Sequence, residues 1–343
     1  MTHKFKEMEK EVIKVVEERM EEVGNTNEVE KHVNPVSNEY FTAASANDCI
    51  YKAMDLPDLH PLWKNLWYEG EVCCFFADTN LGKSIYAVQI GDAVARNRRV
   101  LYFDFEMGDR QFKERYTDSK EGFVHIFSDG FIRLTPNVAS SSDYDANILR
   151  AIEHSMIQNH ADTAIIDNLT SLCNGSEAGD VAGRFMQDLM GLKRKYGWSI
   201  MIVAHTPKLP FGEPISVNSL AGSKRLITFF DSAFALGRSM ADENIRYLKQ
   251  VKIRSGEMTY GADNVITMTL EKRDGFLGFV ETGFATEYSL LRRPKEPSER
   301  DREVMELTRQ GMSQREIAQK LGVSQPMVHK IQRRLQRENL LEA

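Results

Sequence analysis

The chain has 343 residues, of which 42% are hydrophobic and 27% are charged, a composition typical of globular proteins with about two domains. No apolar run approaches the ~18 residues of a membrane-spanning helix, and the N-terminus leads into a charged segment rather than a signal sequence. We therefore expect a cytoplasmic protein without a membrane partner. The net charge of −6 excludes a uniformly basic nucleic-acid coat but not a local basic patch.

Residues 1–61 are expected to form a helical N-terminal segment and a linker. Within residues 7–23, apolar residues recur at spacings of three and four, which predicts a helix with one apolar face. That face suits either a helix packed on its own domain or an oligomerisation helix. A polar linker over residues 24–38 and a second helical stretch over residues 39–54 are expected to follow.

A candidate phosphate-binding loop lies between a strand-like run over residues 72–76 and a helix-like run over residues 85–90. Its residues are Ala77, Asp78, Thr79, Asn80, Leu81, Gly82, Lys83 and Ser84. Such a loop needs backbone N–H groups that face a polyphosphate, a lysine for the β- and γ-phosphates and a hydroxyl for Mg²⁺. Lys83 and Ser84 stand where those two side chains are needed. Ala77 replaces the usual first glycine, and alanine fits there if its φ is negative.

Strand-like and helix-like runs alternate over residues 62–291, which predicts an α/β domain with a mostly parallel sheet flanked by helices. The later strands are expected to be antiparallel. The expected strands cover residues 72–76, 100–105, 131–134, 163–166, 199–204, 229–236, 245–253 and 265–270.

Polar residues follow several of these strands, at the sheet edge where open α/β folds bind their ligands. Asp167 is expected to support Mg²⁺ beside Ser84, and the alternative is a simple strand-end cap. Glu106 is the expected general base, which orients a water in line with the γ-phosphate. His205 is expected to touch the γ-phosphate and report hydrolysis to the loop that follows it. The alternative for His205 is a histidine that only satisfies the end of its strand.

The order of the phosphate loop and residues 103–106, 165–168 and 204–208 resembles the RecA-like ATPase superfamily. Within that superfamily, the spacing and the segment 220–224 are similar to the RepA-like and DnaB-like hexameric helicases of plasmids and mobile elements. The resemblance covers residues 62–291. It implies a RecA-like fold, ATP as the nucleotide, Glu106 as the residue that activates water and Asp167 as the support for Mg²⁺.

The resemblance also implies a homo-oligomer, either a ring, with six subunits in the related helicases, or a filament. Lys252 and Arg254 match a Lys-x-Arg pair that members of the family place on a late strand, from which it reaches the nucleotide of the adjacent subunit. A guanidinium supplied in this way neutralises the charge that develops on the transferred phosphoryl group. The alternative is a solvated strand face, which produces the same spacing. The loops over residues 172–183 and 208–219, which grip single-stranded DNA in RecA-like motors, are not notably basic here.

Residues 292–343 are expected to form a small helix-turn-helix domain that binds DNA. A helix over residues 298–309 precedes one that Ser313 and Glu316 cap, and a turn at Gly322 leads to a helix over residues 325–337. That last helix holds four Lys or Arg residues and no acidic residue, which favours a surface facing phosphates. The alternative is a helical tail that binds no DNA. The expected DNA contacts are Ser324, Gln325, Met327, His329, Lys330, Arg333 and Arg334.

Two functions fit these features. The first is an ATP-hydrolysing, ring-forming helicase or loader that acts on the DNA of a plasmid or mobile element. The second is an oligomeric DNA-binding regulator that ATP controls and that has no helicase activity. A small-molecule kinase would leave the Lys-x-Arg pair and the C-terminal helices unexplained. Tyr116, Arg115 and Arg110 are candidates for contacts to adenine.

Overall fold

The computed structural model describes residues 14, 36–39, 41–56, 58–118, 120–137, 144–168, 178–206, 212–220, 226–292 and 298–337. The chain divides into two compact units, Met1–Asp58 and Leu59–Ala343. The predicted helix over residues 7–23 lies outside the described residues except at Lys14, and so does most of the segment 220–224. In the described ranges, no helix combines the length and the apolar character that crossing a bilayer requires.

The first unit contains helix α2 (Ala46–Met54), which is shorter than the helical stretch predicted over residues 39–54. Ser45 determines where it begins, because its side chain accepts a hydrogen bond of 3.1 Å from the backbone N–H of Asp48. No residue of α2 is buried.

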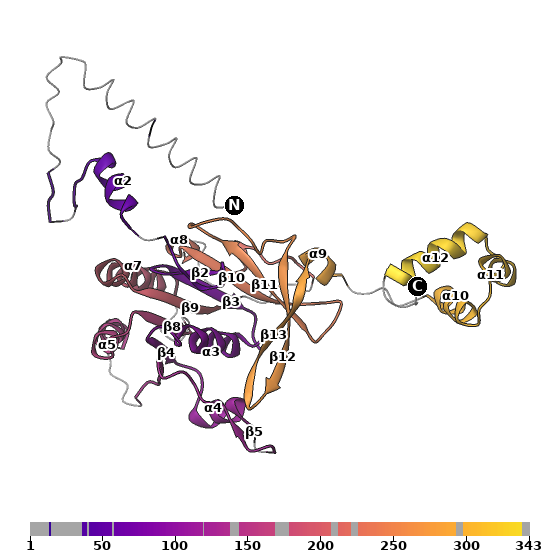
Figure 1. Ribbon diagram of the computed structural model, residues 1–343, viewed down its shortest axis with the longest axis horizontal. Helices are drawn as coiled ribbons and strands as arrows, with labels where there is room; N and C mark the ends of the chain where they lie inside the picture. Colours follow the sequence, from indigo (N-terminus) through magenta and orange to yellow (C-terminus); the bar gives the residue numbers. More distant parts are fainter. Residues whose placement is uncertain are drawn as a thin grey trace, which may run out of the picture. The chain divides into compact units, whose positions relative to one another are not determined.

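The second unit is built on a sheet of nine strands in the order β13-β12-β11-β10-β3-β9-β8-β4-β7 (Figure 1). The strands from β7 to β10 are parallel, and β11, β12 and β13 are antiparallel. Their bounds are β3 (Val72–Ala77), β4 (Val100–Asp104), β7 (Phe131–Leu134), β8 (Thr163–Asp167), β9 (Ser199–His205), β10 (Ser232–Arg238), β11 (Ile245–Lys252), β12 (Val265–Arg273) and β13 (Phe276–Ala285).

The predicted fold is therefore confirmed, a mostly parallel sheet whose later strands are antiparallel. Two details differ. The strand expected over residues 229–236 begins only at Ser232, because helix α8 (Leu226–Phe229) occupies the preceding residues. Strand β13 was not predicted, because its glycines interrupt the alternation of apolar and polar residues, although Asp274-Gly275 is a typical hairpin turn.

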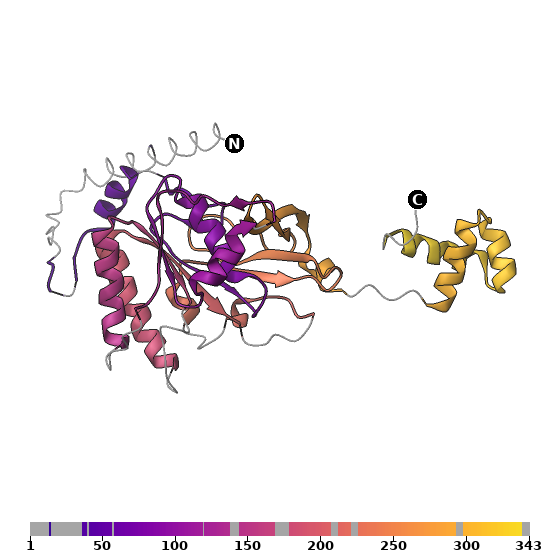
Figure 2. The same ribbon diagram turned by 90° about the horizontal axis from the view of Figure 1, so that it is seen from below.

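Helices cover both faces of the sheet. Along β3, Cys74 and Phe76 belong to an apolar cluster with residues of α5 (Tyr144–Gln158) and α7 (Ala178–Tyr196), and Cys73 and Phe75 belong to a second cluster with residues of α3 (Lys83–Val94). Successive side chains of a strand point to opposite faces, so a strand buried on both sides is apolar throughout. Figure 2 shows α5 and α7 lying side by side. The layers leave the strand ends free to form a site.

The smaller elements lie outside this sheet. Strands β1 (Pro61–Trp63) and β2 (Trp67–Tyr68) form one hairpin, and β5 (Thr117–Asp118) and β6 (Phe123–Val124) form another. The shorter helices are α4 (Asp109–Tyr116), the 3₁₀ turn η1 (Val217–Ser219) and α9 (Glu287–Leu290).

The edge strand β13 packs on α3. Gln89 of α3 binds the backbone of Phe279 twice: its Nε2 donates to the carbonyl oxygen at 2.9 Å, and its Oε1 accepts from the N–H at 2.7 Å. The amide of one side chain thus satisfies strand groups that have no strand beside them. As a result, the edge strand β13 is held against the middle of α3.

The C-terminal residues form three helices, α10 (Glu299–Arg309), α11 (Gln314–Leu321) and α12 (Gln325–Arg337), as predicted. Capping boxes at Ser298 and Ser313 begin the first two helices. Gly322, with φ of 64°, ends α11 in the left-handed conformation that favours glycine. The buried core consists of Val304, Leu307, Ile317, Ala318, Val328, Ile331 and Leu335.

Candidate functional site

The phosphate loop connects the end of β3 to the start of α3. Positive φ angles occur at Asn80 (62°) and Gly82 (97°) but not at Ala77, the last residue of β3. This explains why alanine is accommodated where glycine is usual. At Gly82, an added Cβ would lie 2.8 Å from the ring of Phe279. Both the backbone conformation and the space therefore require glycine there.

Lys83 is the first residue of α3 and is 6% exposed. Its Nζ donates a hydrogen bond of 3.0 Å to the carbonyl oxygen of Asp78 across the loop. Burial lowers the pKa of Lys83, and the carboxylates of Glu106, Asp167 and Asp78 partly oppose that shift. The ammonium group is thus held among acidic groups at a helix N-terminus, where phosphates bind well.

Asp167 ends β8 and is fully buried. Burial raises the pKa of Asp167 to about 6, and the neighbouring hydroxyl groups of Tyr102 and Ser84 limit the rise. Its Oδ1 has no hydrogen-bond partner within the part of the chain that the structure describes. A buried carboxylate oxygen without a partner is costly, and together with the nearby Ser84 hydroxyl it matches the oxygen ligands that Mg²⁺ prefers. The residues therefore fit a bound Mg²⁺.

Glu106 lies two residues beyond the end of β4, and a turn held by Asp104 positions it. The buried Asp104 Oδ1 accepts hydrogen bonds from the backbone N–H groups of Glu106 (3.1 Å) and Met107 (2.8 Å), and its Oδ2 pairs with Arg133 at 2.8 Å. The sequence places β4 next after the phosphate loop, but in space β9 and β8 separate β4 from β3. Glu106 thus reaches the site across two intervening strands.

His205 ends β9, the strand that pairs directly with β3. Its Nε2 lies 3.3 Å from Glu106 Oε1. Asn168, for which no role was predicted, contacts both residues: its Nδ2 donates to Glu106 Oε1 and is 3.1 Å from His205 Nε2. The only sequence signal for Asn168 was its place directly after Asp167.

Lys252 and Arg254 lie away from the phosphate loop. Lys252 is the last residue of β11 and pairs with Ala233, near the start of β10. Because β10 runs parallel to β3, Lys252 lies toward the amino end of β3. Its Nζ donates to the carbonyl oxygen of Ile227 at 2.7 Å. Arg254 lies beyond the strand instead of on it, and pairs with Asp231 at 3.1 Å. Neither residue is therefore near the phosphate loop of its own chain.

The three adenine candidates do not form one surface. Tyr116 is 2% exposed, and its ring packs at 5.0 Å from Phe127 and 5.1 Å from Phe276, so it is not accessible to a base. Arg115 contacts the sulfur of Met107, and the Arg110 side chain is 92% exposed.

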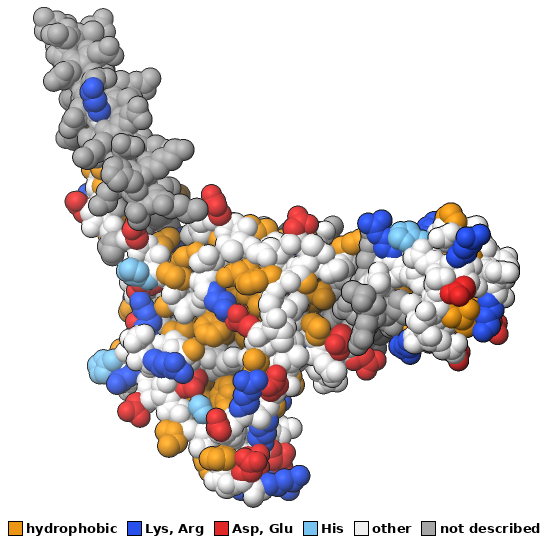
Figure 3. All heavy atoms as spheres, turned by 45° about the vertical axis from the view of Figure 1, so that its right-hand side comes forward, with side chains coloured by type: hydrophobic (Ala, Val, Ile, Leu, Met, Phe, Trp, Pro, Cys, Tyr) orange, Lys and Arg blue, Asp and Glu red, His pale blue; other side chains and the backbone are white. Residues whose placement is uncertain are grey.

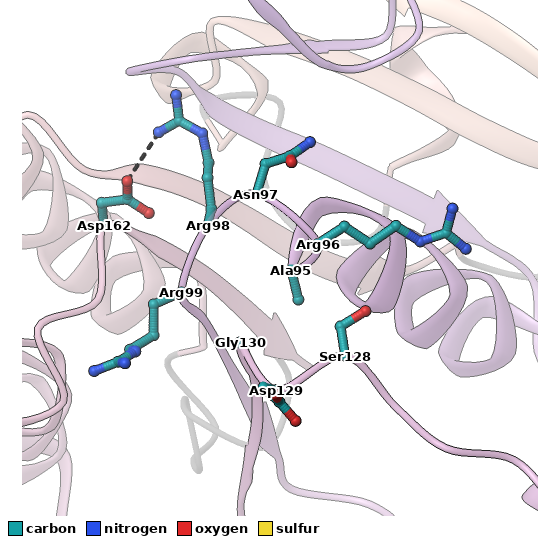
Figure 4. A pocket seen from close by; sticks show the side chains of 9 residues that line it. All are labelled: Ala95, Arg96, Asn97, Arg98, Arg99, Ser128, Asp129, Gly130 and Asp162. Atoms are coloured by element: carbon teal, nitrogen blue, oxygen red, sulfur yellow. Dashed lines mark hydrogen bonds and ion pairs between the residues drawn. The ribbon is translucent and has the colours of Figure 1, made fainter.

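An open pocket of about 720 Å³ lies near the amino ends of β4, β7 and β8, away from the strand ends that carry the phosphate loop and Asp167. It is lined by residues 95–99, 128–130 and Asp162 (Figure 4). Its three arginines point in different directions, and Arg98 pairs with Glu69 at 2.5 Å and with Asp162 at 2.9 Å. This pocket therefore presents no set of converging cationic groups.

The predicted DNA-contacting residues, Ser324 and those of α12, are all exposed. Val328, Ile331 and Leu335 face the core, so the helical period of 3.6 places Lys330 and Arg333 on the opposite side. Figure 3 shows Lys, Arg and His side chains on the visible face of the C-terminal helices. Arg334, by contrast, forms an ion pair with Asp301 of α10. The guanidinium of Arg334 is therefore engaged within the domain.

Some predicted features fall outside the described residues. These are residues 172–177 of the loop predicted over residues 172–183, whose remaining residues belong to α7, residues 208–211 of the loop predicted over residues 208–219, and the side chain of Arg337, the fourth Lys or Arg residue of the last helix.

The phosphate loop, the buried carboxylate at the end of β8 and the mostly parallel sheet define a P-loop NTPase. A family model described as an AAA domain matches residues 38–210, half of the chain, and the chain belongs to this family. A second model, described as a winged helix-turn-helix DNA-binding domain, matches residues 298–342. The described residues of that region, 298–337, contain three helices and no strand.

Among solved structures, a KaiC-like protein from the hyperthermophilic archaeon Pyrococcus horikoshii OT3 is similar to this chain. The identity is 16% and the TM-score 0.44, over 62% of this chain and 91% of that one. A comparison with curated protein sequences gave no match.

Proposed function

We propose that this chain is an ATP-hydrolysing, ring-forming helicase or loader that acts on the DNA of a plasmid or mobile element in the cytoplasm, similar to the RepA-like and DnaB-like hexamers. The proposal rests above all on one observation. Glu106, whose carboxylate suits the activation of water, lies with His205 at the edge of the sheet that also carries Lys83 and Asp167. A protein that only binds nucleotide has no need of this carboxylate.

Each residue has a distinct role in the proposed reaction. Lys83 and the N–H groups at the start of α3 bind the β- and γ-phosphates. Ser84 and Asp167 would hold Mg²⁺, which would neutralise negative charge on the phosphates. Glu106 accepts a hydrogen bond from the attacking water and orients it, and His205 contacts the γ-phosphate.

The position of Lys252 and Arg254 supports a site shared between subunits. Because both lie toward the amino end of β3, they can approach a phosphate loop only if it belongs to another copy of the chain. In a ring, Arg254 would neutralise the transition-state charge in the adjacent subunit.

We propose three domains: an N-terminal segment over residues 1–61, an ATPase domain over 62–291 and a DNA-binding domain over 292–343. One helix-turn-helix makes few phosphate contacts, so a single copy binds weakly. Several copies arrayed by the ATPase ring would gain affinity from their effective concentration.

A second candidate is a DNA-binding regulator whose oligomeric state ATP controls. It is favoured by the ion pair between Arg254 and Asp231, which holds Arg254 within its own chain when no neighbour is present.

ATP hydrolysis with and without single-stranded DNA tests the first proposal, with Lys83→Ala as the inactive control. Stimulation by DNA, together with strand displacement that is lost in Glu106→Gln, is the expected result. ATP-dependent oligomerisation and DNA binding without strand displacement would favour the regulator.

A further inference from the structure

Asn168 completes a closed triangle with the proposed base and the proposed γ-phosphate contact. The amide of Asn168 is 2% exposed, whereas 37% of the Glu106 side chain is exposed. Asn168 Nδ2 donates to Glu106 Oε1 and is 3.1 Å from His205 Nε2, and that nitrogen is 3.3 Å from the same Glu106 oxygen. One carboxylate oxygen is therefore shared by two neighbours.

The chemistry of the three groups determines how they can bond. The Asn168 nitrogen can only donate, and turning the amide over would bring its oxygen against the Glu106 carboxylate. Nε2 of His205 can accept the second hydrogen of the Asn168 amide only when Nε2 itself carries no proton. When Nε2 of His205 is protonated, it donates a hydrogen bond to Glu106 Oε1 instead. In both arrangements Asn168 keeps its bond to Glu106.

Glu106 needs such an anchor because of its place in the fold. It lies beyond the end of β4, and Asp104 holds only its backbone. A glutamate side chain has several rotatable bonds, so a partly exposed one occupies many conformations unless a partner selects one. Asn168, buried at the end of β8, is a rigid point from which to hold it.

We propose that Asn168 is a positioning residue for ATP hydrolysis, which holds Glu106 Oε1 so that Oε2 remains available to the attacking water. The inference rests on the proposed function and extends it to a residue outside the phosphate loop. Asn168 acts through Glu106 and has no contact with the nucleotide in this role.

The test is a double-mutant cycle in the full-length chain, measured as the single-turnover rate of ATP hydrolysis. The variants are Asn168→Ala, Glu106→Ala and the double variant, with nucleotide affinity measured by calorimetry using a non-hydrolysable ATP analogue. We expect Asn168→Ala to lower the rate by about 10- to 100-fold with affinity unchanged, since misplacing a reacting group has effects of this size. In the Glu106→Ala background, the same substitution should cost nothing further.

Asn168→Asp is the matched variant, because it keeps the volume of the side chain and replaces the donor with an acceptor. It should lower the rate at least as much as alanine does, and it serves as the test if Asn168→Ala does not fold. Three results would overturn the inference while leaving the proposed function standing. The first is that Asn168→Ala lowers the rate equally with Glu106 present and in Glu106→Ala, the second is an unchanged rate in Asn168→Asp, and the third is a loss of nucleotide affinity. A wild-type chain no more active than Lys83→Ala would contradict both.

Discussion

The hydroxyl of Tyr102 donates a hydrogen bond of 2.6 Å to Oδ2 of Asp167, and both side chains are fully buried. The residues lie on neighbouring strands, β4 and β8. This bond stabilises the ionised form of Asp167, because the carboxylate accepts it. It also fixes the carboxylate so that Oδ1 is the oxygen left without a partner in the described part of the chain.

Tyr102→Phe should weaken Mg²⁺-dependent nucleotide binding several-fold near pH 6.5. Removing the donor raises the pKa of Asp167 above its value of about 6, so less of the residue is ionised to bind the cation. The deficit should shrink at pH 8.5, where Asp167 is ionised in both proteins. Calorimetry at the two pH values measures it.

Tyr116→Phe is the control for that substitution. Tyr116 is also a buried tyrosine, but its hydroxyl has no hydrogen-bond partner within the described ranges. Nucleotide affinity should be unchanged, and an equal loss in both variants would refute the role given to Tyr102.

Asp167→Asn should stabilise the magnesium-free, nucleotide-free protein at neutral pH. The folded-state pKa of about 6 lies above the ordinary 3.8, so the folded chain holds a proton that the unfolded chain has lost between about pH 4 and 6. The contribution of Asp167 to stability therefore falls as the pH rises through that window, and stays low above it. Replacing Asp167 with asparagine removes the cost of burying an ionised carboxylate, and this raises the free energy of unfolding by at most about 3 kcal/mol at pH 7.

Urea denaturation at pH 4.5 and pH 7.5 measures this effect. The gain in the free energy of unfolding should appear mainly at pH 7.5, and nucleotide binding with Mg²⁺ should be lost. A substitution that destabilises the protein at both pH values would show that Asp167 has a structural role only.

Arg254→Ala should leave ATP binding intact and lower ATP hydrolysis by about 10³-fold, the scale of an arginine supplied to a phosphoryl-transfer site. Calorimetry and steady-state hydrolysis separate the two quantities. Arg246→Ala is the control, because Arg246 lies on β11, the strand that ends just before Arg254, and its hydrogen bonds within the described residues go to the nearby carbonyl oxygens of Glu243 and Ile245. Equal effects of the two substitutions would argue against a specific role for Arg254.

Lys330→Ala and Arg333→Ala should each weaken DNA binding by the full-length chain and lower its salt dependence by about one phosphate contact. Arg334→Ala should instead lower the thermal stability of the C-terminal helices, because Arg334 is paired with Asp301. Binding measured over a salt series, together with thermal melts, distinguishes these outcomes. Identical effects of all three would mean that the ion pair does not separate Arg334 from the DNA-facing side.

The sequence was sufficient for features that depend on local order. The apolar run of β3, the loop to Lys83 and the caps at Ser313 and Gly322 each have a signature within a few residues. The helices of the C-terminal domain were predicted nearly to the residue for the same reason.

Features that depend on distant parts of the chain were not predictable. The role of Asn168 depends on three strands that meet at one edge, and the lack of space at Gly82 depends on Phe279, nearly 200 positions later. The engagement of Arg334 depends on α10. In each case the partner is chosen by the fold, and no spacing in the sequence records it.

Mixing two inactive variants tests whether the proposed ATPase site is shared between copies of the chain. Lys83→Ala lacks a working phosphate loop but keeps Arg254. Arg254→Ala keeps the phosphate loop but lacks the arginine. We predict that each variant alone hydrolyses little ATP and that an equimolar mixture, assembled with single-stranded DNA, recovers a substantial part of the wild-type rate. A mixture no more active than the sum of its components, with mixed oligomers shown to form, would rule out a site shared between subunits.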